Sequence, residues 1–166
     1  MATVALVLAG VADIFYHTTA GTASASVTTQ FGYTTDGVMI TYTPTVNDIE
    51  VEEETFAINR VIQKEEFEIT FNMAENTLTY LQWGMAGGLT GGAGIVDLGG
   101  GAMVDVALRV YGHGPTATHR TIYIPYANPV GAVGMSYRKG EATIIPLTFK
   151  AYQGVASADV VNITDA

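Results

Sequence analysis

The sequence predicts a mainly β, α+β fold: a β-sandwich or a split β-barrel with one α-helix at about residues 73–84. Apolar and polar residues alternate with a period of two along much of the chain. Threonine, valine, isoleucine and tyrosine, which strands prefer, are abundant. One short segment has helical spacing instead. We expect residues 1–166 to form a single domain, because this length is typical of one domain.

The predicted strands follow one another from residue 38 onward. Their same-face apolar sets are Val38, Ile40 and Tyr42; Phe56, Ile58 and Ile62, with Arg60; Phe67, Ile69 and Phe71; Val104, Val106, Leu108 and Val110; Ile122, Ile124 and Tyr126; and Ile145, Leu147 and Phe149. Pro146 suggests that the last strand lies at an edge or contains a bulge. Residues 17–30, rich in small and polar residues, are expected to form a loop or an edge strand.

The helix is predicted from its cap and its apolar stripe. Asn72 and Glu75 have the spacing of a capping box. Leu78, Leu81 and Met85 lie on one helical face, and the glycines from Gly84 onward end the helix. Residues 86–101 follow, and eight of these sixteen residues are glycine. We expect a long loop there.

Charge is scarce and mostly acidic. Only 14% of the residues are charged, 48% are apolar and the net charge is −9. A monomer with so few charged groups lacks polar cover, so we expect much of its surface to be buried against copies of itself. The balance argues against a nucleic-acid binder, whose affinity comes from Lys and Arg. It still permits a surface that DNA passes without adhering.

The first residues are read as an interface arm. The apolar run from Val4 to Ala12 is too short for a membrane span of about 20 residues and lacks the basic flank of a signal peptide. We expect residues 1–20 to form a packed strand or an N-terminal arm, with no membrane partner.

Nine of the sixteen acids lie between Asp48 and Glu75, opposed there only by Arg60 and Lys64. Asp48, Glu50, Glu52 and Glu54 alternate along one predicted strand face. Such a run is explained if these acids keep an exposed edge strand soluble. The alternative is a repulsive lining, because several copies in a ring would focus negative potential inside it.

Enzymatic interpretations fare poorly, and no catalytic residue, cofactor or metal is expected. The glycine stretch has no Lys for a phosphate loop. The three histidines lack zinc-site spacing and the chain has no cysteine. Glu66 and Glu68 share a strand face, but a hydrolase would need a sugar-binding cleft as well. A β-sandwich carbohydrate-binding or hydrolytic module stays open as an alternative.

Several stretches, in order, resemble a tailed-bacteriophage tail tube (major tail) protein of the long, non-contractile, siphophage type. They are GYTTDGVMI (32–40), FEITFNMAENTLTYLQWGM (67–85), and ALRVYGHGP, RTIYIPYANP and YRKGEATIIPLTFKAY (between residues 107 and 152). Each stretch alone is a general pattern of alternating apolar residues and turn glycines that many β proteins share. Their order and the lone helix carry the resemblance.

The resemblance implies a structural virion protein whose hexameric rings stack into a tail tube, assembled in the host cytoplasm. Its implied partners are the tape measure protein and viral DNA, which pass through the lumen, and the tail terminator and distal tail proteins at the ends. Residues 1–20 and 86–101 would bridge rings. The tube of a contractile tail or a secretion system is the nearest alternative.

Two sets of residues are predicted to serve this assembly. The lumen-lining candidates are Asp48, Glu50, Glu52, Glu54, Glu66, Glu68 and Asp105. The inter-subunit candidates are Leu78, Leu81, Trp83, Leu89, Ile95, Val96 and Leu98, of which the helix residues are candidates for the core as well. Reversing Glu66 and Glu68 to lysine should leave tubes assembled but slow or block genome delivery.

Overall fold

A computed structural model describes residues 12–50, 56, 58–75, 77–85, 103–113, 119–134, 143–155 and 159–165. The elements are β1 (Ala12–His17), a 3-10 turn (Ser24–Ser26), β2 (Thr29–Gln30), β3 (Thr34–Ile49), β4 (Asn59–Met73), α1 (Leu78–Gly84), β5 (Val106–His113), β6 (His119–Pro129), β7 (Ile145–Ala151) and β8 (Asn162–Asp165). Among these residues the fold is mainly β with one α-helix, as predicted.

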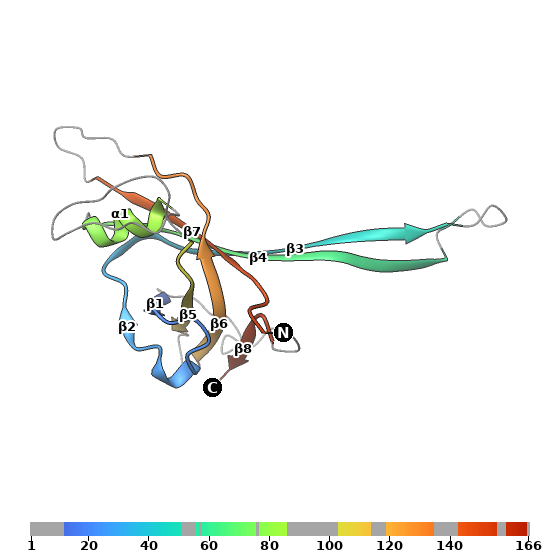
Figure 1. The fold of residues 1–166 in the computed structure, drawn as a ribbon, viewed down its shortest axis with the longest axis horizontal. Helices are drawn as coiled ribbons and strands as arrows, with labels where there is room; N and C mark the ends of the chain where they lie inside the picture. The colour runs from blue at the N-terminus through green and yellow to red at the C-terminus, as the bar shows by residue number, and fades with distance from the viewer. Residues whose placement is uncertain are drawn as a thin grey trace, which may run out of the picture.

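The described strands form one open antiparallel sheet (Figure 1). Its order is β2-β1-β5-β6-β7-β4-β3, and β8 pairs with β6 beside this path. The predicted sandwich or split barrel therefore takes the form of a single sheet. The short strands β2 and β8 complete it, and the alternation pattern had not predicted β8.

The core lies on the side of the sheet that α1 covers, and every strand from β4 to β7 contributes to it. Phe31, which follows β2, is 1% exposed. Its ring centroid lies 4.6 Å from that of Tyr16, 5.3 Å from those of Phe71 and Trp83, and 6.2 Å from that of Phe149. This aromatic cluster joins β1, β4, β7 and α1 around one residue.

The helix begins later than predicted. Asn72 and Met73 belong to β4, where Met73 is buried and pairs with Ile145 of β7. Thr77 is the actual N-cap, and its hydroxyl accepts a hydrogen bond from the Tyr80 N–H at 3.3 Å. The Asn72–Glu75 capping box is therefore wrong. Sheet pairing and burial of Met73 outweigh a local capping signal.

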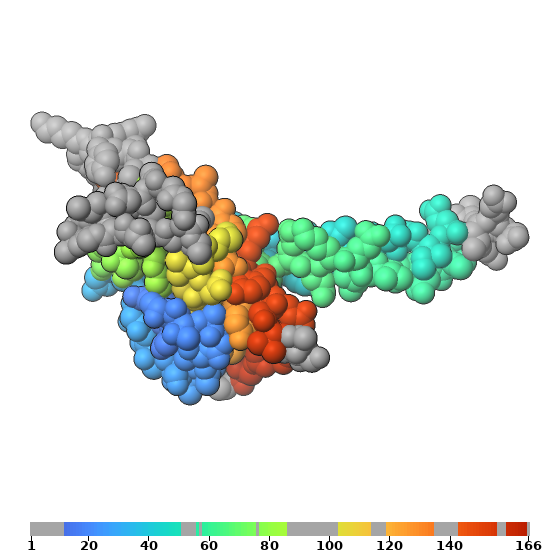
Figure 2. Space-filling model, in the orientation of Figure 1, coloured from blue at the N-terminus to red at the C-terminus, as the bar shows by residue number. Residues whose placement is uncertain are grey.

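β3 and β4 form a long hairpin that projects from the rest of the molecule as an arm (Figures 1 and 2). Two irregularities interrupt its register. Asp36 and Gly37, with φ of 64° and 76°, form a bulge near its base. Farther out, Thr45 pairs with Lys64 and Val46 with Ile62, so Gln63 is the extra residue.

Other predictions fare differently. Residues 17–30 contain the edge strand β2, as predicted. Pro146 pairs with Asn72 in a part of β7 that has no β6 partner in the described sheet, which agrees with an edge position. No helix in the described ranges is long and apolar enough to cross a membrane. Most of the expected N-terminal arm (residues 1–11) and the expected glycine-rich loop lie outside the described residues.

Candidate assembly surface

The outer half of the hairpin is exposed on both faces. All residues from Thr41 to Glu50 and from Asn59 to Glu65 are exposed. β4 pairs with β7 only as far out as Glu68, so beyond that point the sheet has just two described strands. An isolated two-stranded hairpin is marginally stable in water. Exposed on both faces, the arm offers a surface that another chain can cover.

Apolar side chains occur on both faces of the arm. Alternation places Tyr42, Val46 and Ile62 on the face that continues from the core. Met39, Ile49 and Val61 lie on the opposite face. Val46 and Ile62 are cross-strand neighbours and are 51% and 55% exposed. Phe56, just before β4, is 84% exposed. Such a concentration of exposed apolar groups is typical of an interaction surface.

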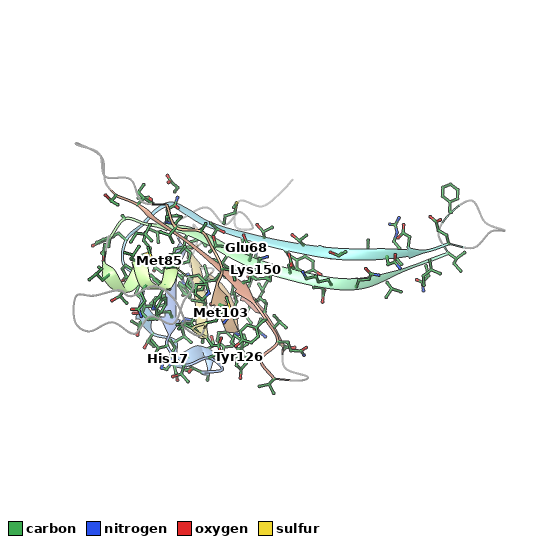
Figure 3. All side chains as sticks on the ribbon, turned by 45° about the horizontal axis from the view of Figure 1, so that its top comes forward. His17, Glu68, Met85, Met103, Tyr126 and Lys150 are labelled. Atoms are coloured by element: carbon green, nitrogen blue, oxygen red, sulfur yellow. The ribbon has the colours of Figure 1, made fainter. Side chains whose placement is uncertain are left out.

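The face opposite the core is polar near the base of the arm. Glu68 and Lys150 lie side by side there, on β4 and β7 (Figure 3), with the Lys150 ammonium 3.8 Å from the Glu68 carboxylate. Glu66 lies 2.5 Å from Lys64 and 3.6 Å from Lys150. We call Lys64, Glu66, Glu68 and Lys150 the basal charge cluster. Its ion pairs cross from β4 to β7 where the arm meets the body.

The basal charge cluster changes the acidity of Glu66. The hydrogen bond from Lys64, with the charge of Lys150, lowers the pKa of Glu66 below its ordinary value. On the other face, the Tyr42 hydroxyl donates a hydrogen bond to Glu65 at 2.5 Å, which raises the pKa of Tyr42. Glu66 therefore stays ionised at a lower pH than an isolated glutamate would.

Glu66→Gln should lower the melting temperature slightly at pH 7. Because the folded state lowers the Glu66 pKa, its contribution to stability is present above the ordinary glutamate pKa. That contribution disappears as the pH falls through the lower folded-state value. Melting curves at pH 7 and pH 3 should thus show a difference between variant and wild type that closes in acid. Glu50→Gln, which removes an exposed carboxylate just beyond β3, is the control and should change the melting temperature less at pH 7.

The lumen-lining candidates do not all lie together. Glu66, Glu68 and Asp105 share the face opposite the core, and the Asn128 amide donates a hydrogen bond to Asp105. Asp48 lies on the other face of the arm, where it binds Arg60 at 2.8 Å. Glu50 is exposed just beyond β3. Glu52 and Glu54 lie outside the described residues.

The inter-subunit candidates on the helix differ in exposure. Trp83 is 8% exposed and packs edge-on against Tyr16 and Phe31 in the core. Leu81 packs against the core and is partly buried, whereas Leu78 is exposed. Leu89, Ile95, Val96 and Leu98 lie outside the described residues.

Sequence reasoning missed the apolar residues of the arm as candidates for contact. Their signal was present in the sequence, because Val61 and Ile62 are consecutive and so must occupy opposite faces of a strand. A strand that is apolar on both faces is either central in a protein or covered by another chain. The exposure of both residues favours the second case here.

Two of the histidines contact side chains on adjacent strands. His113 lies 2.8 Å from the Asp13 carboxylate, and the His119 ring stacks on Tyr111 at 4.8 Å. Within the described ranges no group of three His, Asp or Glu side chains is arranged to hold a metal ion.

Comparisons with known proteins add a structural likeness. No family model and no curated protein matches the chain. Among solved structures, it is similar to the cryo-EM structure of the anti-feeding prophage cap (AFP tube terminating cap), with a TM-score of 0.47 and 12% identity. The match covers 92% of this chain and 88% of the other. At this identity and TM-score the likeness carries no functional conclusion.

Proposed function

We propose that this chain is a structural subunit of a phage-type tail, forming six-membered rings that stack into a hollow tail tube. DNA and a tape measure protein would pass through the lumen, while terminator and distal tail proteins would close the two ends. The protein performs no chemistry in this proposal. Its work is to assemble and to keep a channel open.

The hairpin arm is the observation that supports self-assembly best. It exposes apolar side chains on both faces and has no described layer against either one. Burying one aliphatic side chain fully contributes about 1.5–3 kcal/mol. The half-exposed residues of the arm can therefore supply several kcal/mol when a neighbouring subunit covers them. The arm also carries charged residues, which oppose such burial, and two of them, Asp48 and Arg60, offset each other in an ion pair.

The ends of the sheet also favour association. β3 forms one end, and its outer edge has no strand partner within the described sheet. At the other end β2 covers only Phe15 and Tyr16 of β1. Closing sheets into a ring removes such edges. About four strands from each of six subunits, spaced by about 4.8 Å and tilted by about 40°, give a circumference of roughly 150 Å. That barrel leaves space for duplex DNA.

The face opposite the core is the candidate lining. It holds Glu66, Glu68 and Asp105, which lysines Lys64 and Lys150 offset in part. The described portion is therefore only weakly acidic in each subunit, and sixfold repetition would raise the local negative potential. A weakly repulsive wall is suited to passage, since DNA phosphates find little to adhere to.

Replacing Glu66 and Glu68 by glutamine should leave rods intact but make them retain duplex DNA. Neutralisation tests the lining more cleanly than reversal to lysine, because reversal would put four lysines within the basal charge cluster and disrupt it. Without the carboxylates, Lys64 and Lys150 are free to bind phosphate. Co-sedimentation of DNA with variant rods should rise at low salt and fall as salt increases. DNA retention equal to that of wild type would show that these acids lie outside the lumen.

Sedimentation of the purified protein tests the proposal as a whole. Six copies of the 17.5 kDa chain give a ring of about 105 kDa, and stacked rings should sediment as much larger species at higher concentration. A single species at the monomer mass over the whole concentration range would refute it.

A further inference from the structure

A groove of about 800 Å³ lies where the hairpin arm leaves the body of the molecule. Its apolar lining includes Phe67 of β4 and Val161 and Ile163 near the C-terminus. Glu65, Glu66 and Asp159 bring three carboxylates to the same groove. The groove therefore combines apolar surface with negative charge, a combination suited to a ligand that carries both apolar and cationic groups.

The charge of the groove is incompletely balanced. No Lys or Arg is among the described residues that line it. Glu66 is paired with lysines of the basal charge cluster, and Glu65 accepts the hydrogen bond of Tyr42. Asp159 is exposed and forms no hydrogen bond or ion pair with a described residue. A cation entering the groove would thus find the Asp159 carboxylate ready to accept its hydrogen bonds, whereas Glu65 and Glu66 keep the partners they already have.

Most cations of this chain already have partners. The chain has seven Lys and Arg. Five are described, each with a partner: Arg60 with Asp48, Lys64 with Glu66, Lys150 with Glu66 and Glu68, Arg120 with Asp165, and Arg109 with the Ser24 carbonyl and the Phe15 ring. The other two are consecutive, Arg138 and Lys139, and directly follow Tyr137. This Tyr-Arg-Lys sequence supplies the cationic groups that the groove lacks, together with an aromatic ring that can pack on its apolar lining.

We infer that the groove of one subunit receives the Tyr137–Lys139 segment of a second copy. This inference rests on the proposed self-assembly and names one contact that would join neighbouring subunits. Because the groove and the segment are different surfaces, the contact is head-to-tail, the type that generates rings or stacks rather than closed two-fold dimers.

The number of residues between the segment and β7 favours binding in the groove of a second copy over binding in the groove of the same chain. The segment connects the end of β6 to the start of β7, and Val133 and Ile145 both lie near Gly84 of α1. Lys139 is four residues from Thr143, a span of at most about 14 Å. β7 itself runs about 20 Å from Ile145 to Ala151, where the groove begins. The segment of the same chain thus falls short of the groove, whereas a neighbour's segment has no such limit.

Single-cysteine variants give a direct test, because the chain contains no cysteine of its own. Asp159→Cys would be made in a tagged chain and Lys139→Cys in an untagged chain, and the two would be mixed, assembled and oxidised. We expect a disulfide-linked heterodimer of the two chains. A matched mixture of Glu50→Cys with Lys139→Cys should give at least about tenfold less, since Glu50 is also exposed but lies outside the groove.

The outcomes separate the inference from the proposed function. Rods that form without the specific heterodimer overturn the groove contact and leave self-assembly standing. A double variant, Asp159→Cys with Lys139→Cys, that cross-links within monomers also overturns it, because the segment would then bind its own groove. Wild-type protein that stays monomeric overturns both.

A charge exchange tests the chemistry of the contact. Asp159→Lys should reduce rod yield by about tenfold, and adding Lys139→Glu to the same chain should restore most of it. Glu50→Lys, the same change of charge outside the groove, should gain nothing from the added Lys139→Glu. Equal losses for Asp159→Lys and Glu50→Lys, with no restoration by Lys139→Glu, would mean that the groove does not bind this segment.

Discussion

Replacing Val46 by lysine and Ile62 by glutamate will leave the monomer folded but reduce the yield of rings and rods at least tenfold. These residues face each other across the outer half of the hairpin arm and are about half exposed. The monomer therefore loses little when they change. Assembly loses their remaining burial, on the order of 1–3 kcal/mol for the pair, and must also desolvate two charges. A loss of 1.4 kcal/mol already weakens association tenfold.

The matched control changes charge on the same strands without removing apolar surface. Asn47→Lys with Gln63→Glu introduces the same two charges at exposed polar positions. Circular dichroism should show both double variants folded, and light scattering should show the stronger assembly defect only for the Val46 and Ile62 pair. If the two double variants assembled equally well, the apolar residues of the arm would not be part of the interface.

Replacing Phe31 by alanine will produce the largest loss of monomer stability. Phe31 is 1% exposed and its ring contacts the rings of Tyr16, Phe71, Trp83 and Phe149. Truncating a buried phenylalanine costs about 3–5 kcal/mol, a large share of the 5–15 kcal/mol typical of a domain. At this chain length the melting temperature should fall by roughly 10 °C.

Tyr33 provides the control for Phe31. It lies two residues away and is 80% exposed, so Tyr33→Ala removes an aromatic ring without opening a cavity. Its effect on the free energy of unfolding should stay within about 0.5 kcal/mol. Urea unfolding of the two variants would measure the contrast. Equal stabilities would mean that the aromatic cluster is not the centre of the core.

The sequence predicted most of the sheet because its strands are long and half-buried. Ile69 and Phe71, or Leu108 and Val110, alternate with outward residues, and the structure buries them as expected. The start of the helix was wrong because the Asn72–Glu75 spacing is a local signal. Pairing of Met73 with Ile145 joins residues far apart in the chain, and no local pattern contains that information.

The arm could be predicted as two strands but not as a projection. Tyr42 and Phe67 have the same alternating pattern, yet Tyr42 is exposed and Phe67 partly buried. What decides exposure is where β7 stops pairing with β4, which depends on the length of a distant strand. Glu66, Glu68 and Lys150 lie close together for the same reason, because the pairing of β4 with β7 brings them there. Their charges are visible in the sequence, whereas the pairing of β4 with β7 that joins them is not.

Electron microscopy of the purified, concentrated protein tests self-assembly into a tube most directly. We expect hollow rods of uniform width with six subunits in each ring, Val46 and Ile62 covered by a neighbouring chain, and Glu66 and Glu68 on the inner wall. Particles that remain single subunits, or rods whose hairpin arms point free into solvent with Glu66 and Glu68 on the outer surface, would contradict it.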